Sequence, residues 1–301
     1  MMKLIIILMI LNAILYSKVH EDCSEKGLNN MFNVKGLKDS KVKKSFSDWV
    51  DEKFGLTPYR PNYMLPFGYT THDYKAWTPT DGTYKNYEAE FQVSLKLAFK
   101  KNLLGYGETW YGAYSQRSFW QLYIKSAPFR ESNYNPEVFV TFPVGSKEYY
   151  GLKSLTFGYS HISNGQGNIK ETDSASSYPT LQNRSRSLNT LFAKATFQQG
   201  SFLFDLKFWT HIASLSDNPD IMDYYGYGRI KALYFYKKNL FTLMGRLNPL
   251  TQKGAMEFTY SYPGYLDGVY LYVKVFSGYG ESLIDYNERL TKYSIGFAFS
   301  R

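Results

Sequence analysis

Apolar and polar residues alternate along most of the chain after about residue 60. The alternation forms about twelve segments of roughly ten residues, separated by turns rich in Gly, Asn, Asp or Pro, as is typical of a transmembrane barrel. The expected strands are 61–71, 88–100, 107–124, 135–144, 149–163, 187–198, 201–213, 224–236, 239–247, 252–262, 267–277 and 290–299. The pattern therefore predicts an all-β transmembrane antiparallel β-barrel of about 12 strands. An even number of strands returns both chain ends to the same side of the membrane.

The expected strand 201–213 indicates which face of the barrel meets lipid. One face is apolar and carries Phe202, Phe204, Leu206, Phe208 and Ile212. The opposite face carries Asp205, Lys207 and His211. Because the apolar face of a barrel strand meets lipid and the other face lines the interior, we expect these polar groups inside the barrel.

Two stretches before the barrel lack the alternation. Residues 1–20 combine an early Lys3 with an apolar run, which is typical of a secretory signal peptide. Residues 21–60 are charged and poorly patterned, and we expect them to form a periplasmic segment ahead of a barrel at 61–301. No later run approaches the ~20 apolar residues of a spanning helix. A membrane protein made from this chain would therefore cross the bilayer with strands, and a soluble secreted β protein is the alternative.

The amino-acid composition indicates which kinds of molecule the protein could contact. The 301 residues include 29 Tyr and 22 Phe, an aromatic excess that favours strands and membrane interfaces. The formal net charge is +9, but Lys and Arg are scattered among aromatic residues rather than clustered. This distribution favours contact with anionic lipid head groups over nucleic acid. The single cysteine, Cys23, fits an exported protein without disulfides.

The stretch FGYSHISNGQGN, residues 157–168, contains two candidate catalytic residues, His161 and Ser163. His161 and Ser163 are two apart on a strand and share its face with Tyr159. The opposite face carries small or polar residues, so we expect His161 and Ser163 to point outward at the edge of the hydrocarbon band. Asn189, on the next expected strand, shares a face with apolar residues and points outward as well. Polar groups facing lipid are costly without a purpose.

These three residue types can form a catalytic triad. A serine hydroxyl becomes a good nucleophile when an imidazole accepts its proton, and a third group can fix the tautomer of that imidazole. Asn189 could do so through its amide oxygen, and backbone N–H groups of the following Asn-Gly-Gln-Gly turn could bind an oxyanion. The alternative is a polar strand end with no catalytic role. The sequence contains no Gly-x-Ser-x-Gly elbow, phosphate-binding Gly loop or Cys/His metal spacing.

The chain also resembles a known family from about Tyr87 to its end. The blocks that carry the resemblance are SQRSFWQL (115–122), SAPFRESNYNPEVFV (126–140), YSHISNG (159–165), SRSLN (185–189), DNPDI (217–221) and SGYGESLIDYN (277–287). They are similar to blocks of the outer-membrane phospholipase A family of Gram-negative bacteria, whose fold is a twelve-stranded barrel. The resemblance implies that His161, Ser163 and Asn189 are the catalytic triad. These are the same three residues that the alternation pattern places on the outward face of adjacent strands.

The resemblance implies further site residues. Calcium would be held by the hydroxyl of Ser185, the main-chain carbonyl of Gln166 and the main-chain carbonyl of Ser126 from a second subunit. The N–H of Gly165 would bind the oxyanion, and Gln116 would lie at the interface of a homodimer that activity requires. The sequence departs from the family pattern in three places: Gln166 stands where Arg is expected, Leu188 stands where Trp is expected, and the linker 164–186 is longer than usual.

These observations together predict a calcium-dependent hydrolase of the outer membrane. Its substrates would be membrane phospholipids and lysophospholipids, cleaved at their sn-1 and sn-2 acyl esters. Two other classes stay open at this point. One is a passive porin, and the other is an adhesin or scaffold barrel whose long loop, 164–186, contacts a partner.

Overall fold

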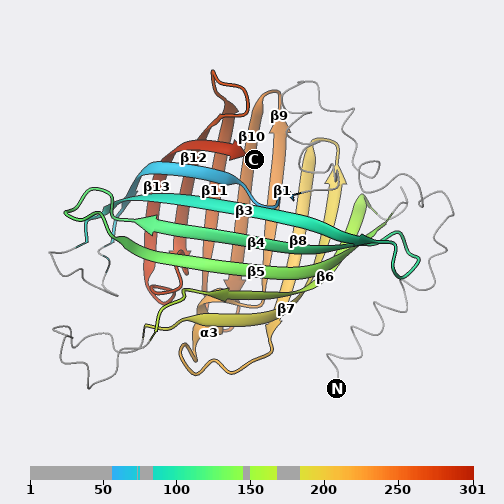
Figure 1. Cartoon of the computed structure of the whole chain (residues 1–301), viewed down its shortest axis with the longest axis horizontal. Helices are drawn as coiled ribbons and strands as arrows, with labels where there is room; N and C mark the ends of the chain where they lie inside the picture. The colour runs from blue at the N-terminus through green and yellow to red at the C-terminus, as the bar shows by residue number, and fades with distance from the viewer. Residues whose placement is uncertain (1–55, 73, 75–83, 145–149, 168–183) are drawn as a thin grey trace.

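Twelve long antiparallel strands close into a barrel (Figure 1). This computed structural model describes residues 56–72, 74, 84–144, 150–167 and 184–301. The strands are β2 (Asn62–Thr70), β3 (Tyr87–Lys101), β4 (Thr109–Trp120), β5 (Phe129–Pro143), β6 (Leu152–Ser163), β7 (Ser187–Gln199), β8 (Phe202–His211), β9 (Gly228–Tyr236), β10 (Asn239–Asn248), β11 (Lys253–Pro263), β12 (Tyr270–Tyr279) and β13 (Arg289–Ser300). Each pairs with the next, and β13 pairs with β2 to close the ring. The predicted all-β barrel is confirmed.

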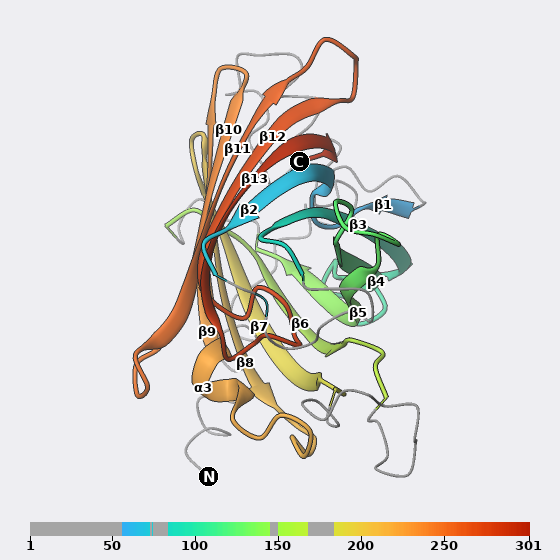
Figure 2. The ribbon, with the colours of Figure 1, turned by 90° about the vertical axis from the view of Figure 1, so that its left-hand side faces the viewer.

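The two ends of the barrel differ in their connections. The end that carries the C-terminus has tight turns at 200–201 and 237–238, and we call it the terminal end. The opposite end, the loop end, carries the long connections 71–86, 164–186 and 212–227. The short helix α3 (Ile221–Tyr225) lies there, away from the C-terminus (Figure 2). Outer-membrane barrels have short periplasmic turns and long extracellular loops, so this arrangement favours a periplasmic terminal end.

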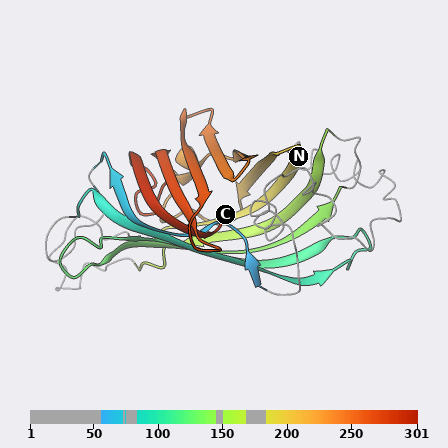
Figure 3. The ribbon, with the colours of Figure 1, turned by 90° about the horizontal axis from the view of Figure 1, so that it is seen from above.

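A thirteenth strand, β1 (Leu56–Pro58), precedes the barrel and pairs with β3 through Leu56↔Leu97 and Pro58↔Leu95. It lies near the C-terminus, as the view from above shows (Figure 3). The last residues of the predicted periplasmic segment therefore extend the sheet. The rest of that segment and the predicted signal peptide lie outside the described residues. In the described part of the chain, no helix is long and apolar enough to cross a membrane.

Ion pairs fill the loop-end half of the lumen. Glu88 and Glu90, on β3, are fully buried. Arg130 donates to Glu88 at 2.9 Å, and Lys292 donates to the same carboxylate at 2.6 Å. Lys274 binds Glu90 at 2.5 Å. Buried charges are tolerated when each is paired and hydrogen-bonded, so this network lets a narrow barrel hold a polar interior.

Replacing Glu88 with Ala is expected to destabilise the barrel. Arg130 and Lys292 would lose a buried carboxylate, which costs about 3–5 kcal/mol of unfolding free energy for a buried ion pair. Urea unfolding followed by heat-modifiable gel migration measures the loss. The control is Glu288→Ala, which breaks only a half-exposed contact with His72 at 3.3 Å and should cost less than about 1 kcal/mol. Equal losses in the two variants would contradict the structural role of the network.

The predicted faces of β8 are confirmed for its two charged residues. Asp205 and Lys207 are buried in the lumen, and they bind Thr196 and Glu137 respectively. His211, the last residue of the strand, is exposed at the rim. A different departure affects β5, which starts at Phe129 rather than at the predicted 135. Arg130 and Glu131, in this extension, are buried. Arg130 binds Glu88 on β3 and Asp285 in the loop before β13, and Glu131 accepts hydrogen bonds from the side chain of Asn133 and the N–H of Ile284.

Candidate active site

The candidate triad lies where β6 ends and β7 begins. His161 and Ser163 are among the last residues of β6, and Asn189 is the third residue of β7. Strand pairing places His161 directly opposite Asn189. All three side chains are half-buried, whereas Ser160 and Thr190, on the other face of the same strands, are buried in the lumen. The predicted outward orientation of the three side chains therefore agrees with the burial pattern.

The ring of His161 is hydrogen-bonded to the amide of Asn189. The distance from His161 Nδ1 to Asn189 Oδ1 is 2.8 Å. An amide oxygen can only accept a hydrogen bond, so Nδ1 carries the proton in this arrangement. The Nε2 atom of the ring is then free to accept a proton from another group, as the base of a triad must. The same Asn189 oxygen accepts a hydrogen bond of 2.6 Å from the hydroxyl of Tyr159.

Ser163 shares the outer face with this pair but is not hydrogen-bonded to either side chain. It lies opposite Ser187 on β7 and Tyr134 on β5. Its hydroxyl makes no hydrogen bond with any of the described residues, so the structure joins His161 and Asn189 and leaves Ser163 beside them. Catalytic hydrogen bonds are often loose before substrate binds, and alternate residues of one strand can close this gap by side-chain rotation.

Gly165 begins the turn after the candidate nucleophile. Its φ of +64° is a left-handed backbone conformation that residues other than glycine rarely adopt. A Cβ at this position would lie 3.0 Å from the ring of Tyr134. Its N–H donates to none of the residues that the structure describes. An unpaired N–H near the end of β6 is available to an oxyanion.

Asn164 holds together the two ends of the long linker. It is 2% exposed. Its amide nitrogen donates to the carbonyl of Arg184 at 2.9 Å, and its oxygen accepts from the N–H of Arg186 at 3.0 Å and of Gln166 at 3.3 Å. These bonds bring Gln166 next to the segment that contains Ser185. The remainder of the linker, 168–183, lies outside the described residues.

Neighbouring loops support the start of β7. Asn218 exchanges two hydrogen bonds of 2.9 Å with the main chain of Ser187. Arg186 lies over the ring of Tyr286 at 5.7 Å. Burial and then the hydrogen bond to Asp220 raise the pKa of Tyr286, so its phenol stays protonated. Sequence reasoning assigned no role to Asn218 or Tyr286, although both belong to the resembling blocks.

A family model described as Phospholipase A1 matches residues 40–299. The chain belongs to the phospholipase A1 family. It is 36% identical over 256 residues to Phospholipase A1 of Klebsiella pneumoniae, with 82% of each chain covered. It is 36% identical over 269 residues to a putative phospholipase A1 of Neisseria meningitidis, covering 82% of this chain but 65% of that relative. The resemblance predicted from the sequence is therefore confirmed.

Solved structures agree with the family assignment. Outer membrane phospholipase A from Escherichia coli has a TM-score of 0.71 and 34% identity, over 81% of this chain and 98% of that one. A Salmonella typhi outer membrane phospholipase dimer with bound calcium has a TM-score of 0.72 and 34% identity, over 84% of this chain and 95% of that one. This member of the phospholipase A1 family is accordingly a barrel of the bacterial outer membrane, and its family is one of phospholipase ester hydrolases.

The residues expected to bind calcium in this phospholipase A1 family member are oxygen donors. No group of three His, Cys, Asp or Glu side chains converges in the described part of the chain. Ser185 contributes a hydroxyl, and the main-chain carbonyl of Gln166 accepts no hydrogen bond from the described residues. The Gln166 side chain is held by the guanidinium of Arg184. Hydroxyl and carbonyl oxygens suit a hard cation, so this donor set fits calcium.

Ser126 and Gln116 are distant from the triad in sequence and are not on its strands, β6 and β7. Ser126 is exposed in the turn between β4 and β5, with a left-handed φ of 64°. Gln116 is on the outer face of β4, where its amide accepts from the hydroxyl of Tyr114 at 3.1 Å and donates to Ser118 at 3.2 Å. An amide on a lipid-facing surface can hydrogen-bond a second subunit.

Proposed function

We propose that this chain is a calcium-dependent outer-membrane phospholipase A that cleaves acyl esters with Ser163, His161 and Asn189. The observation that carries the proposal is the hydrogen bond of 2.8 Å between His161 and Asn189 on the outer face of the barrel. Family membership supports it, because the relatives are phospholipases. A solved Escherichia coli outer membrane phospholipase A with 32% identity is an active-site mutant in which an asparagine is replaced by alanine. That mutant supports an asparagine as part of the site.

His161 and Ser163 would have separate roles in the two steps of the reaction. His161 Nε2 takes the proton from Ser163 Oγ while Oγ attacks the ester carbonyl carbon, which forms a tetrahedral oxyanion. The alcohol leaves with the proton from Nε2, and the acyl group stays on Ser163. Water then attacks the acyl-enzyme and gives one proton to Nε2. The bond from the acyl carbon to Ser163 Oγ breaks, Nε2 returns that proton to Oγ, and the fatty acid leaves.

Asn189 and Gly165 stabilise charge during these steps. The Asn189 oxygen keeps the proton of the ring on Nδ1 and stabilises the imidazolium that forms, although less than a carboxylate would. The N–H of Gly165 donates to the oxyanion. Calcium held by Ser185, Gln166 and the partner subunit's Ser126 would add positive charge near that oxyanion.

The outward position of the site determines its substrates. Phospholipids diffuse along the lipid-facing surface, so their acyl esters can reach Ser163 without entering the lumen. Phospholipids and lysophospholipids expose chemically similar esters, and we propose hydrolysis at both sn-1 and sn-2 positions. A homodimer with Gln116 at its interface would complete each calcium site.

Two assays on the purified protein test this proposal against a porin. Fatty acid release from phospholipid–detergent micelles is expected in calcium, and planar bilayers are expected to show little conductance because buried ion pairs occupy the lumen. Large, stable conductance together with no ester release, with or without calcium, would contradict the phospholipase assignment.

A further inference from the structure

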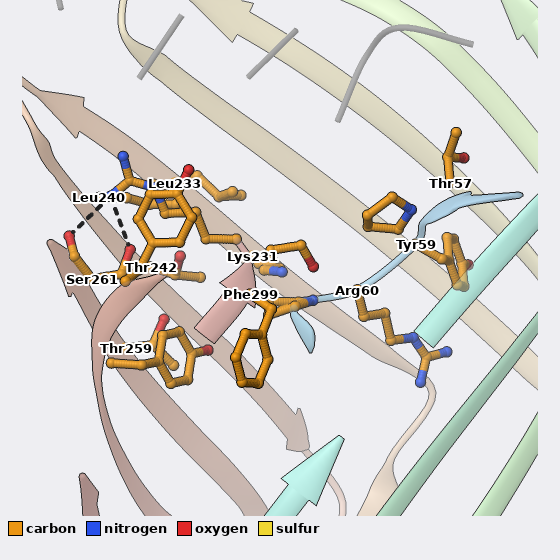
Figure 4. Close-up of a pocket in the computed structure, with 16 residues that line it drawn as sticks. Thr57, Tyr59, Arg60, Lys231, Leu233, Leu240, Thr242, Thr259, Ser261 and Phe299 are labelled. Atoms are coloured by element: carbon orange, nitrogen blue, oxygen red, sulfur yellow. Dashed lines mark hydrogen bonds between the residues drawn. The ribbon is translucent and has the colours of Figure 1, made fainter. Parts of the chain in front are cut away.

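Positive charge gathers around two adjoining cavities of the lumen, the larger of which lies at the terminal end. A cavity of about 350 Å³ opens there, and Figure 4 shows Lys231, Thr242, Thr259 and Ser261 around it. A deeper cavity of about 120 Å³ adjoins it, and the two share Tyr59, Arg60 and Lys231 in their walls. Both cavities lie on the inside of the barrel, whereas the candidate triad lies on its outer face.

The charges lining these cavities do not balance. The basic residues in the two walls are Arg60, Lys96, Lys194, Lys207, Arg229, Lys231 and Arg301. Among the described residues, Asp205 is the one acidic side chain in either wall. A second carboxylate nearby, Glu137, is already bound by Arg60 and Lys207.

Three of these cations form no ion pair within the part of the chain that the structure describes. Lys194 and Lys231 make no ion pair or hydrogen bond with the residues that the structure describes. Arg229 has a buried Nε atom without a hydrogen-bond partner in the same part of the chain. In the loop-end half, by contrast, Arg130 and Lys292 each bind buried carboxylates. Unpaired like charges in a weakly screened cavity repel one another, and an anion among them would offset that repulsion.

We propose that these two adjoining cavities of the lumen bind a multivalent oxyanion of the phosphate class. Lys194, Arg229 and Lys231 would hold its charged oxygens, since a guanidinium fork matches phosphate geometry and ammonium groups add point charges. Hydroxyls of Thr242 and Thr259, in the wall of the larger cavity, can donate to the remaining oxygens. The ligand would enter from the periplasmic side.

Titration of the purified full chain with inorganic pyrophosphate tests this site. Isothermal titration calorimetry in detergent is expected to show binding that weakens as sodium chloride is raised. A Lys194→Gln, Arg229→Gln double variant is expected to bind at least about tenfold more weakly, because it loses two charge-assisted contacts. Heat-modifiable gel migration confirms that each variant is folded.

The control variant is Lys237→Gln, which removes a cation from an exposed turn at the same end of the barrel. It is expected to bind pyrophosphate like the wild type. Equal affinity in the wild type and the double variant would overturn the proposal, as would a wild type that binds no pyrophosphate at millimolar concentration.

A second inference concerns the candidate triad and rests on the proposed function. The Tyr159 hydroxyl donates to the same Asn189 oxygen that binds His161, at 2.6 Å. Tyr159 is two residues before His161 on the outer face of β6 and is 38% exposed. We infer that Tyr159 is a positioning residue, which holds the amide of Asn189 with its oxygen toward the ring.

The lipid-facing position of Asn189 explains why its amide needs a residue that fixes its orientation. An amide can turn so that its nitrogen, rather than its oxygen, faces the ring. The proton of His161 would then move to Nε2, and the ring could no longer accept the proton of Ser163. At a lipid-facing surface, water is scarce and cannot hold the amide in place. The phenol of Tyr159 donates to the oxygen and favours the productive orientation.

Tyr159→Phe removes this hydroxyl and keeps the ring. We expect kcat for ester hydrolysis to fall roughly three- to tenfold, the value of one hydrogen bond, with KM unchanged. In an Asn189→Ala background the same substitution should have no further effect. Nitrogen-15 NMR of the histidines should show a larger Nε2-protonated fraction of His161 in the Tyr159→Phe protein.

The NMR measurement separates this inference from the proposed function, because it needs no turnover. An unchanged tautomer in the Tyr159→Phe protein would overturn the positioning role even if the protein is a hydrolase. An altered KM that persists in the Asn189→Ala background would also overturn it, since it would place the phenol against the substrate.

Discussion

Ser163→Ala is expected to reduce ester hydrolysis by about 10³-fold or more, because it removes the proposed nucleophile while His161 and Asn189 remain. The barrel should stay folded, since the Ser163 hydroxyl makes no hydrogen bond with the described residues. Fatty acid release from micelles gives the activity, and heat-modifiable gel migration of the same sample reports folding.

A matched control lies on the same strand. Ser154 is also on β6, but it is 4% exposed and belongs to the lumen wall. Ser154→Ala removes the same hydroxyl from the opposite face and should leave hydrolysis within about twofold of the wild type, as a substitution away from the reacting atoms does. Near-normal turnover by a folded Ser163→Ala protein would rule out the serine-hydrolase mechanism.

Calcium removal is expected to have the second-largest effect. If calcium bridges Ser185 and Gln166 of one subunit and the carbonyl of the partner subunit's Ser126, calcium stabilises the dimer and the dimer strengthens calcium binding by the same factor. Activity and dimerisation should therefore fall together as a chelator is added. Cross-linking and ester release, measured on the same samples across a calcium titration, follow both quantities.

Substitutions separate side-chain from main-chain ligands in this titration. Ser185→Ala removes a proposed hydroxyl ligand and should raise the calcium concentration for half-maximal activity roughly tenfold or more. Ser126→Ala should have a smaller effect, because its proposed ligand is a main-chain oxygen. Ser177→Ala, in the same linker but outside the SRSLN block, is the control. Full activity in a chelator-treated protein that cross-linking shows to be monomeric would contradict both the metal and the dimer.

The local pattern was sufficient for the barrel and for the orientation of its faces. Alternation with a period of two fixes which residues share a face, so Asp205 and Lys207 could be placed inside from the sequence. The same rule placed His161 and Ser163 on one outward face. It missed the start of β5, which was predicted at 135 and begins at Phe129. Arg130 in this extension is bound by Glu88 and Asp285, which are distant in sequence.

For the candidate site, too, some features could be predicted from the sequence and others could not. The motif blocks predicted His161, Ser163 and Asn189 as the site, and the expected pairing of the two strands on either side of the linker 164–186 predicted that they lie close together. The role of Tyr159 was not predicted, although its position on the outer face was. Periodicity gives the face of a side chain but not its rotamer, and a hydrogen bond depends on the rotamer.

The sequence by itself determined the number of strands, the lipid-facing surface and the family. Each of these depends on alternation patterns or motif blocks whose residues are close together in the chain. Tertiary structure alone decided how the lumen is filled. Glu88 meets Lys292, and Glu90 meets Lys274, across separations that no local pattern encodes. It also left Lys194, Arg229 and Lys231 together around a cavity of the lumen. Burial makes the pairing of charges energetically decisive, and only closure of the barrel determines which charges are buried together.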